Sequence, residues 1–172
     1  LYPTQVNTIV RLISDIKKKY DDVHICESGF GAGHFTTLAL LQNRTSLTVF
    51  DTFHMIHQKK IMEKLKEKFP NRVNFVPGDS KKSIKSYNGR MCHIVHISVP
   101  QNEMFDLYNF RKIAFEDTLV TATALNKHFP LYSSIFPDAK RLYFIKNFTC
   151  ETVESVPLSH NLFMSKGERS SQ

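Results

Sequence analysis

The chain has 172 residues, of which 41% are hydrophobic, and it carries a formal net charge of +7. These values fit one domain over residues 1–172 whose apolar core needs no disulfide or metal ion to fold. No apolar run approaches the roughly 20 residues that cross a bilayer, so no membrane span is expected. The lysines stand in helix-like segments beside acidic residues, which favours solvated helix faces over a nucleic-acid surface.

Helix-like and strand-like patterns alternate along the chain. Apolar residues spaced by three and four positions indicate helices, and short β-branched runs indicate strands. In chain order we expect a helix at 4–20, a strand at 23–28, a helix at 34–43, a strand at 46–51, a helix at 54–69, a strand at 72–79, a strand at 91–98, a helix at 103–115 and a strand at 118–125. Five strands that alternate with helices predict a parallel sheet covered on both faces.

The C-terminal part breaks this alternation. Strand-like runs at 141–151 and 160–168 are separated by too few residues for a helical crossover, so they are expected to pair antiparallel. The predicted fold is therefore α/β, a Rossmann-like, doubly wound, seven-stranded sheet that is mostly parallel and ends in an antiparallel hairpin. The aromatic and apolar segment 126–139 is expected to line a substrate pocket, to form a lid or to contact a second copy in a homodimer.

Cysteines and glycosylation sequons give opposing indications of the cellular compartment. Cys26, Cys92 and Cys150 are odd in number and stand in apolar stretches, which favours buried free thiols and a cytoplasmic location. The triplets Asn-Arg-Thr at 43–45 and Asn-Phe-Thr at 147–149 are acceptor sequons and keep secretory passage open. The chain begins without a methionine and is expected to be a processed chain or an excised domain.

The stretch ICESGFGAGHF holds three of the six glycines at alternate positions. Gly29, Gly31 and Gly33 fall between the first strand and the next helix, where they permit a sharp turn and the close approach of a ligand. Asp51 closes the second strand, where a carboxylate can accept both ribose hydroxyls of a nucleoside. His34 replaces the third small residue of the dinucleotide fingerprint, and no Gly-Lys-Ser/Thr follows, so neither NAD nor a P-loop nucleotide is expected.

The motif ESGFGAGHFT resembles motif I of the class I S-adenosylmethionine-dependent methyltransferases. The likeness continues through VFDTF, VNFVPGDS, HIVHIS and NFRKIAFEDTLV and covers nearly the whole chain in the expected order. Within this class, the sequence is most similar to the O-methyltransferase-like group called methyltransferase domain 24. The resemblance implies S-adenosylmethionine as the cofactor and a small-molecule acceptor, and RNA methylation is the less favoured reading.

The resemblance also implies which residues hold the cofactor. An acidic residue and the glycine-loop backbone would bind its amino-acid end, Asp51 would bind the ribose, and a phenylalanine would wall the site. A carboxylate and a hydroxyl after the third strand would lie beside the adenine, although this carboxylate, on Asp79, could instead cap a helix that begins at Lys81, and Phe53 could be a core residue. The implied residues are Glu27, Ser28, Gly29, Phe30, Gly31, Gly33, Asp51, Phe53, Asp79 and Ser80.

Family members that methylate catechol-like hydroxyls bind a divalent metal through an aspartate after strand four and an acidic or amide pair after strand five. Those places here hold Ser98 and the sequence TATALN at 121–126, in which only Asn126 is a candidate ligand. Hard cations prefer carboxylate oxygens, so no catalytic metal is expected.

A methyl transfer needs a positioned acceptor and a base when the acceptor carries a proton. The histidines that could serve as this base are His96 and His34, followed by His54 and His57, and a structural or solvent-facing role is the competing interpretation for each. Two hypotheses remain open. The chain is either a metal-independent methyltransferase or a non-catalytic binding module that keeps the fold.

Overall fold

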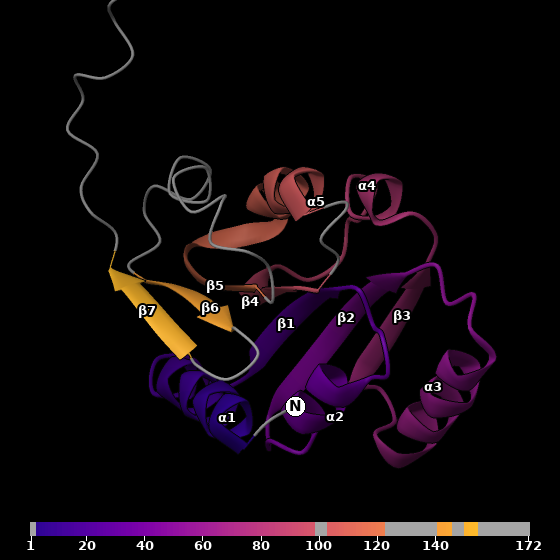
Figure 1. Ribbon diagram of the computed structural model, residues 1–172, viewed down its shortest axis with the longest axis horizontal. Helices are drawn as coiled ribbons and strands as arrows, with labels where there is room; N and C mark the ends of the chain where they lie inside the picture. Colours follow the sequence, from indigo (N-terminus) through magenta and orange to yellow (C-terminus); the bar gives the residue numbers. More distant parts are fainter. Residues whose placement is uncertain (1–2, 99–102, 123–140, 146–149, 155–172) are drawn as a thin grey trace, which may run out of the picture.

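The computed structural model describes residues 3–98, 103–122, 141–145 and 150–154. Helices and strands alternate through most of this part and build a central sheet with helices on both faces (Figure 1). The helices are α1 (Pro3–Lys17), α2 (His34–Leu40), α3 (Ile56–Lys68), α4 (Ser80–Ser83), α5 (Glu103–Phe110) and the 3-10 turn η1 (Arg111–Ile113). The strands are β1 (Val23–Ser28), β2 (Thr45–Asp51), β3 (Val73–Pro77), β4 (Cys92–Ile97), β5 (Ala114–Ala122), β6 (Arg141–Ile145) and β7 (Cys150–Glu154).

Five parallel strands form the central part of the sheet in the order β3-β2-β1-β4-β5. This order confirms the predicted doubly wound parallel arrangement, because the chain winds outward from β1 in one direction and then in the other. Beyond β5, β6 pairs parallel with β5, and β7 pairs antiparallel with β6. The strand order reverses between β1 and β4, since the chain passes from β1 to one side of the sheet and then returns to the other. Sheets of this kind bind ligands at the carboxyl ends of the strands beside such a reversal.

The largest differences from the predicted elements lie at β5 and in the range 141–151. Strand β5 begins at Ala114, within the range 103–115 expected to be helical, because buried Ala114 pairs with Cys92 of β4 and η1 ends the helix before it. The range 141–151, expected as one strand, instead holds β6 and the start of β7. The strand expected at 160–168 lies outside the described residues. Among the described residues no helix has the length and apolar character that a bilayer crossing requires.

The first face of the sheet is covered by α1, α2 and α3 (Figure 1). The amphipathic helix α1 contributes Ile9, Leu12 and Ile13, which are almost completely buried. They pack with Ile25 and Ile94 of the central strands. Helix α1 therefore packs on the middle of the sheet. At the carboxyl ends of the strands, the glycine loop follows β1 and the turn into α3 follows β2.

The opposite face is covered by α4 and α5 and contains a disulfide between Cys26 of β1 and Cys92 of β4. Both cysteines are completely buried, and their Cα atoms are 5.7 Å apart. The prediction of free thiols at these two positions was therefore wrong. The pairing follows from the strand order, which makes β1 and β4 neighbours although the two cysteines are 66 residues apart in the sequence.

Candidate cofactor site

The glycine loop joins β1 to α2 at the carboxyl edge of the sheet. Gly29, Gly31 and Gly33 have φ values of 88°, 54° and 71°, in the left-handed region that favours glycine. Gly31 is exposed, and a Cβ built on it would meet no atom within 4 Å. The three glycines therefore form the sharp turn that their spacing predicted, and Gly31 presents bare backbone to solvent, whereas Gly29 and Gly33 are buried.

Asp51 fixes this loop to the end of β2. Its Oδ2 accepts a hydrogen bond of 2.7 Å from the backbone N–H of Phe30, and its Oδ1 accepts one of 2.9 Å from the N–H of Phe53. Buried Gln58 of α3 places Nε2 3.5 Å from the same Oδ2. A carboxylate offers about four acceptor positions. The Thr52 hydroxyl also donates to Oδ1 over 3.3 Å, so each oxygen of Asp51 has two donors. The contacts from Gln58 and Thr52 are the longer ones, and ligand hydroxyls beside the loop would replace these two.

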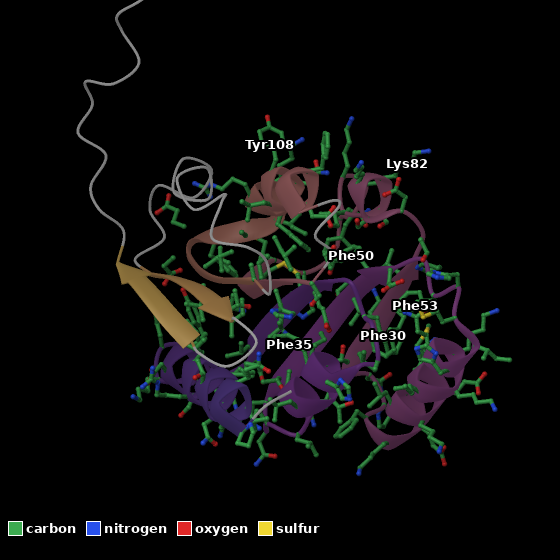
Figure 2. The ribbon with its side chains drawn as sticks, in the orientation of Figure 1. Phe30, Phe35, Phe50, Phe53, Lys82 and Tyr108 are labelled. Atoms are coloured by element: carbon green, nitrogen blue, oxygen red, sulfur yellow. A yellow bond between two sulfur atoms is a disulfide. The ribbon has the colours of Figure 1, made fainter. Side chains whose placement is uncertain are left out.

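Phe30 and Phe53 lie in the core beneath the loop rather than along an open wall. Only 3% and 4% of their surfaces are exposed, and both rings make edge contacts with Phe75 of β3. Figure 2 shows the two rings close together on the side of the sheet that α3 covers. For Phe53, the arrangement found is the core position considered as its alternative. An added Cβ at Gly33 would lie 2.7 Å from the Phe30 ring, so this ring also fixes the end of the loop.

Glu27 is buried on the first face of the sheet, two residues before Gly29. Its carboxyl group accepts a hydrogen bond from the hydroxyl of Thr36 in α2. Burial raises the pKa of Glu27 to about 8, and the nearby Asp51 carboxylate acts in the same direction. The side chain is therefore mostly neutral at neutral pH, and a cation placed beside it would favour its ionised form.

Ser28, the next residue, points to the opposite face. Its hydroxyl donates to the carboxylate of Asp106 on α5, a residue with no exposed surface. Burial raises the pKa of Asp106, and its Oδ1 has no hydrogen-bond partner among the described residues. Asp106 was missed among the sequence-predicted residues, although its position in the helix pattern, next to buried Leu107 and four residues before buried Phe110, marks it as a charged residue on a core face.

Asp79 and Ser80 follow β3 at the same edge of the sheet. The side chain of Asp79 accepts a 3.1 Å hydrogen bond from the N–H of Lys81 and so caps the short helix α4. Helix capping is the alternative role that the sequence left open for Asp79. The residue is exposed. Ser80 is buried. Asp79 and Ser80 therefore lie directly after β3, the position at which the resemblance predicts the adenine.

His96 is buried at the end of β4, stacked on Phe35 of α2 with ring centroids 3.7 Å apart. Its Nδ1 lies 2.9 Å from Thr121 Oγ1, and its Nε2 lies 2.9 Å from Ser98 Oγ. The Thr121 hydroxyl donates to the carbonyl of Val95, so it accepts from Nδ1–H, which leaves Nε2 to accept from Ser98. Burial lowers the pKa of His96 to about 3. His96 therefore orients the Ser98 hydroxyl and does not itself reach the edge of the sheet.

The remaining histidine candidates lie on the surface. His34 begins α2 next to the glycine loop, and His54 and His57 lie before and in α3, where all three are exposed. No group of three potential metal ligands occurs among the described His, Cys, Asp and Glu side chains. Asn126 lies outside the described residues, so the absence of a catalytic metal stays a prediction.

Comparison with known proteins identifies the fold. No family model and no curated protein matches the sequence. An S-adenosylmethionine-dependent methyltransferase from Agrobacterium tumefaciens superposes with a TM-score of 0.58 at 12% identity, covering 85% of this chain and 55% of that one. An rRNA methylase from Streptococcus thermophilus gives a TM-score of 0.54 at 11% identity, covering 73% and 78%. The fold is that of the class I methyltransferases.

The matched structures are longer than this chain. The chain spans about half the length of several of the structures that it resembles, 54% and 55% in two cases. Identities this low establish the shared fold only. The motif resemblance noted in the sequence agrees with this fold.

Proposed function

We propose that the chain binds S-adenosylmethionine and transfers its methyl group to a small-molecule acceptor without a catalytic metal. The observation that carries this proposal is the glycine loop with Asp51 bound to its backbone, at the carboxyl edge of β1 and β2. The same proposal includes a relationship to methyltransferase domain 24 and a seven-stranded sheet completed by the antiparallel pair β6 and β7.

The residues present fit each part of this cofactor. The ribose diol would bind Asp51 in place of the long contacts from Thr52 and Gln58. The main chain of the loop can approach the amino-acid end at Gly31 without a Cβ in the way. The ammonium group would lie near Glu27, whose buried carboxyl group ionises once a cation compensates it. Asp79, exposed at the end of β3, would accept from the adenine amino group.

The bound cofactor supplies an electrophilic methyl group on a sulfonium. The contribution of the chain is to hold the acceptor in line with it, which is the main requirement for a displacement. Ser98 is the described side chain at the carboxyl end of β4, and its hydroxyl proton is directed to His96. Its outward lone pair would therefore accept a hydrogen bond from an acceptor O–H or N–H and orient it.

Calorimetric titration with S-adenosylmethionine and S-adenosylhomocysteine tests the cofactor site. We expect Asp51→Ala to weaken both by about 10- to 100-fold, the effect of losing hydrogen bonds to a charged group. Asp21→Ala removes a carboxylate that is 99% exposed, at the other end of β1, and is expected to leave binding unchanged. A folded wild-type protein that binds neither compound would contradict the proposal.

Turnover then separates an enzyme from a binding module. The purified chain would be incubated with S-adenosylmethionine carrying a labelled methyl group and a panel of small alcohols, phenols and amines. If the chain is an enzyme, we expect labelled product with at least one acceptor and much less labelled product from the Asp51→Ala variant. Binding without turnover on any acceptor would favour the non-catalytic module.

A further inference from the structure

The disulfide between Cys26 and Cys92 gives information about the compartment in which the chain folds. Both residues have no exposed surface and lie between the sheet and α5, in a cluster that includes Phe110. Reactive or redox-sensing cysteines are accessible to solvent, whereas buried ones are structural. Structural disulfides form in oxidising compartments and are rare in the cytosol. This bond therefore favours secretory passage over the cytoplasmic location that free thiols suggested.

An independent observation concerns the sequon at 43–45. Asn43 is exposed in the turn between α2 and β2. This turn lies at the edge of the sheet where β1 and β2 begin, since Thr45 pairs with Val23. The glycine loop lies at the opposite edge, after Ser28. A large polar group on Asn43 would project into solvent and leave the candidate cofactor site open.

We propose that the chain folds in an oxidising secretory compartment and carries an N-linked oligosaccharide on Asn43. In the transfer, Asn43 Nδ2 forms a bond to C1 of a lipid-diphosphate-linked oligosaccharide, the bond from C1 to the diphosphate breaks, and the amide proton leaves with the lipid diphosphate. Closure of the disulfide passes two electrons and two protons from the two thiols to a disulfide oxidant, which is reduced to a dithiol.

The surroundings of Thr45 determine when the oligosaccharide is added. Thr45, the hydroxyl residue of the acceptor triplet, is 2% exposed in the folded chain. Its hydroxyl lies 2.6 Å from the carbonyl of Ala39 and accepts a 3.1 Å hydrogen bond from Arg72. The triplet is therefore accessible only before the α2–β2 turn closes. We expect modification during translocation of the chain and none on the folded protein.

The test expresses the chain behind a secretory signal and, for comparison, in the cytosol. For the secreted product we expect a fall in mass on treatment with peptide N-glycosidase, conversion of Asn43 to aspartate by that enzyme, and a Cys26–Cys92 peptide pair under non-reducing conditions. Asn43→Gln abolishes this glycan, and Thr45→Ser, which retains a hydroxyl, keeps it. Asn147→Gln removes the second sequon and leaves the signal from Asn43 intact.

Each outcome bears on the proposal. An unmodified Asn43, or free thiols at Cys26 and Cys92, in the folded secreted product would overturn it. The same measurement on protein captured by antibody from the cells that make it tests the natural compartment, and free thiols with an unmodified Asn43 there would also overturn it. Neither result depends on cofactor binding, so failure here leaves the proposed methyltransferase function untouched.

Discussion

Replacing Glu27 with glutamine is expected to stabilise the cofactor-free protein while weakening its affinity for S-adenosylmethionine. Glu27 is 1% exposed, and its described hydrogen bond comes from the Thr36 hydroxyl. Glutamine has nearly the same shape and its carbonyl can accept that bond. The substitution therefore removes the ionisation of a buried carboxyl group, and the cost of burying the amide N–H groups does not change with pH.

The size of the effect follows from the two pKa values of Glu27, 4.5 as the ordinary value and about 8 in the folded protein. Below pH 4.5 both states hold the proton and no penalty exists. As the pH rises above 4.5 the unfolded chain releases the proton that the folded protein keeps, so stability falls by about 1.4 kcal/mol per pH unit. The loss is about 3 kcal/mol at pH 7 and levels off at about 5 kcal/mol above pH 8.

Urea unfolding without cofactor, followed by circular dichroism at pH 5, 6, 7 and 8, measures this loss. The free-energy difference between Glu27→Gln and the wild type should increase in favour of the variant with each pH unit. Glu63→Gln, at an exposed position of α3, is a matched control and should show no such trend. A difference that stays constant from pH 5 to pH 8 would refute the reasoning. Titration with S-adenosylmethionine should show weaker binding to Glu27→Gln, because the ammonium group loses its counter-charge.

Three further predictions concern stability. Gly33→Ala should cost about 2–4 kcal/mol in urea unfolding, because φ is 71° and the new Cβ would lie 2.7 Å from the Phe30 ring; an unchanged midpoint would contradict this close approach of the loop to the ring. Reduction, or Cys26→Ala with Cys92→Ala, should cost about 4 kcal/mol for a closed loop of 66 residues, and identical curves with and without reductant would argue against the bond. His96→Asn should abolish a fall in stability that the wild type shows below pH 6.5, since burial lowers the pKa to about 3 and the unfolded chain takes up the proton first; an equal slope in the variant would show that other groups cause it.

The part of the site that the sequence predicted is the part formed by consecutive residues. Strand β1, the glycine loop and the start of α2 form one continuous stretch, so glycine spacing and an apolar lead-in identify them. Asp51 was found because a carboxylate at the end of the second strand of such a unit lies beside the loop. Its hydrogen bond to the Phe30 N–H agrees with that local argument.

Features that depend on strand order or on packing across the sheet were not predicted. The pairing of Cys26 with Cys92 requires β1 and β4 to be neighbours, and no short-range pattern shows this. The contact of Ser28 with Asp106 likewise requires α5 to lie over β1. The burial of Phe30 follows from packing against α3 and β3, whereas its position in the loop suggested a ligand-facing ring.

Glu27 and Ser28, the two residues before Gly29, place polar side chains on opposite faces of the sheet at the same end of β1. Glu27 points toward α2 and Ser28 toward α5, where Asp106 is buried, and burial raises the pKa of both carboxyl groups. Burying a carboxyl group without a cation is unfavourable, and burial lowers the pKa of the buried histidines nearby, His24 and His96, so neither supplies a positive charge. The desolvation cost is thus concentrated directly beneath the glycine loop. A cationic ligand bound there would lower that cost at Glu27, and its binding should therefore stabilise the folded protein more at pH 8 than at pH 5.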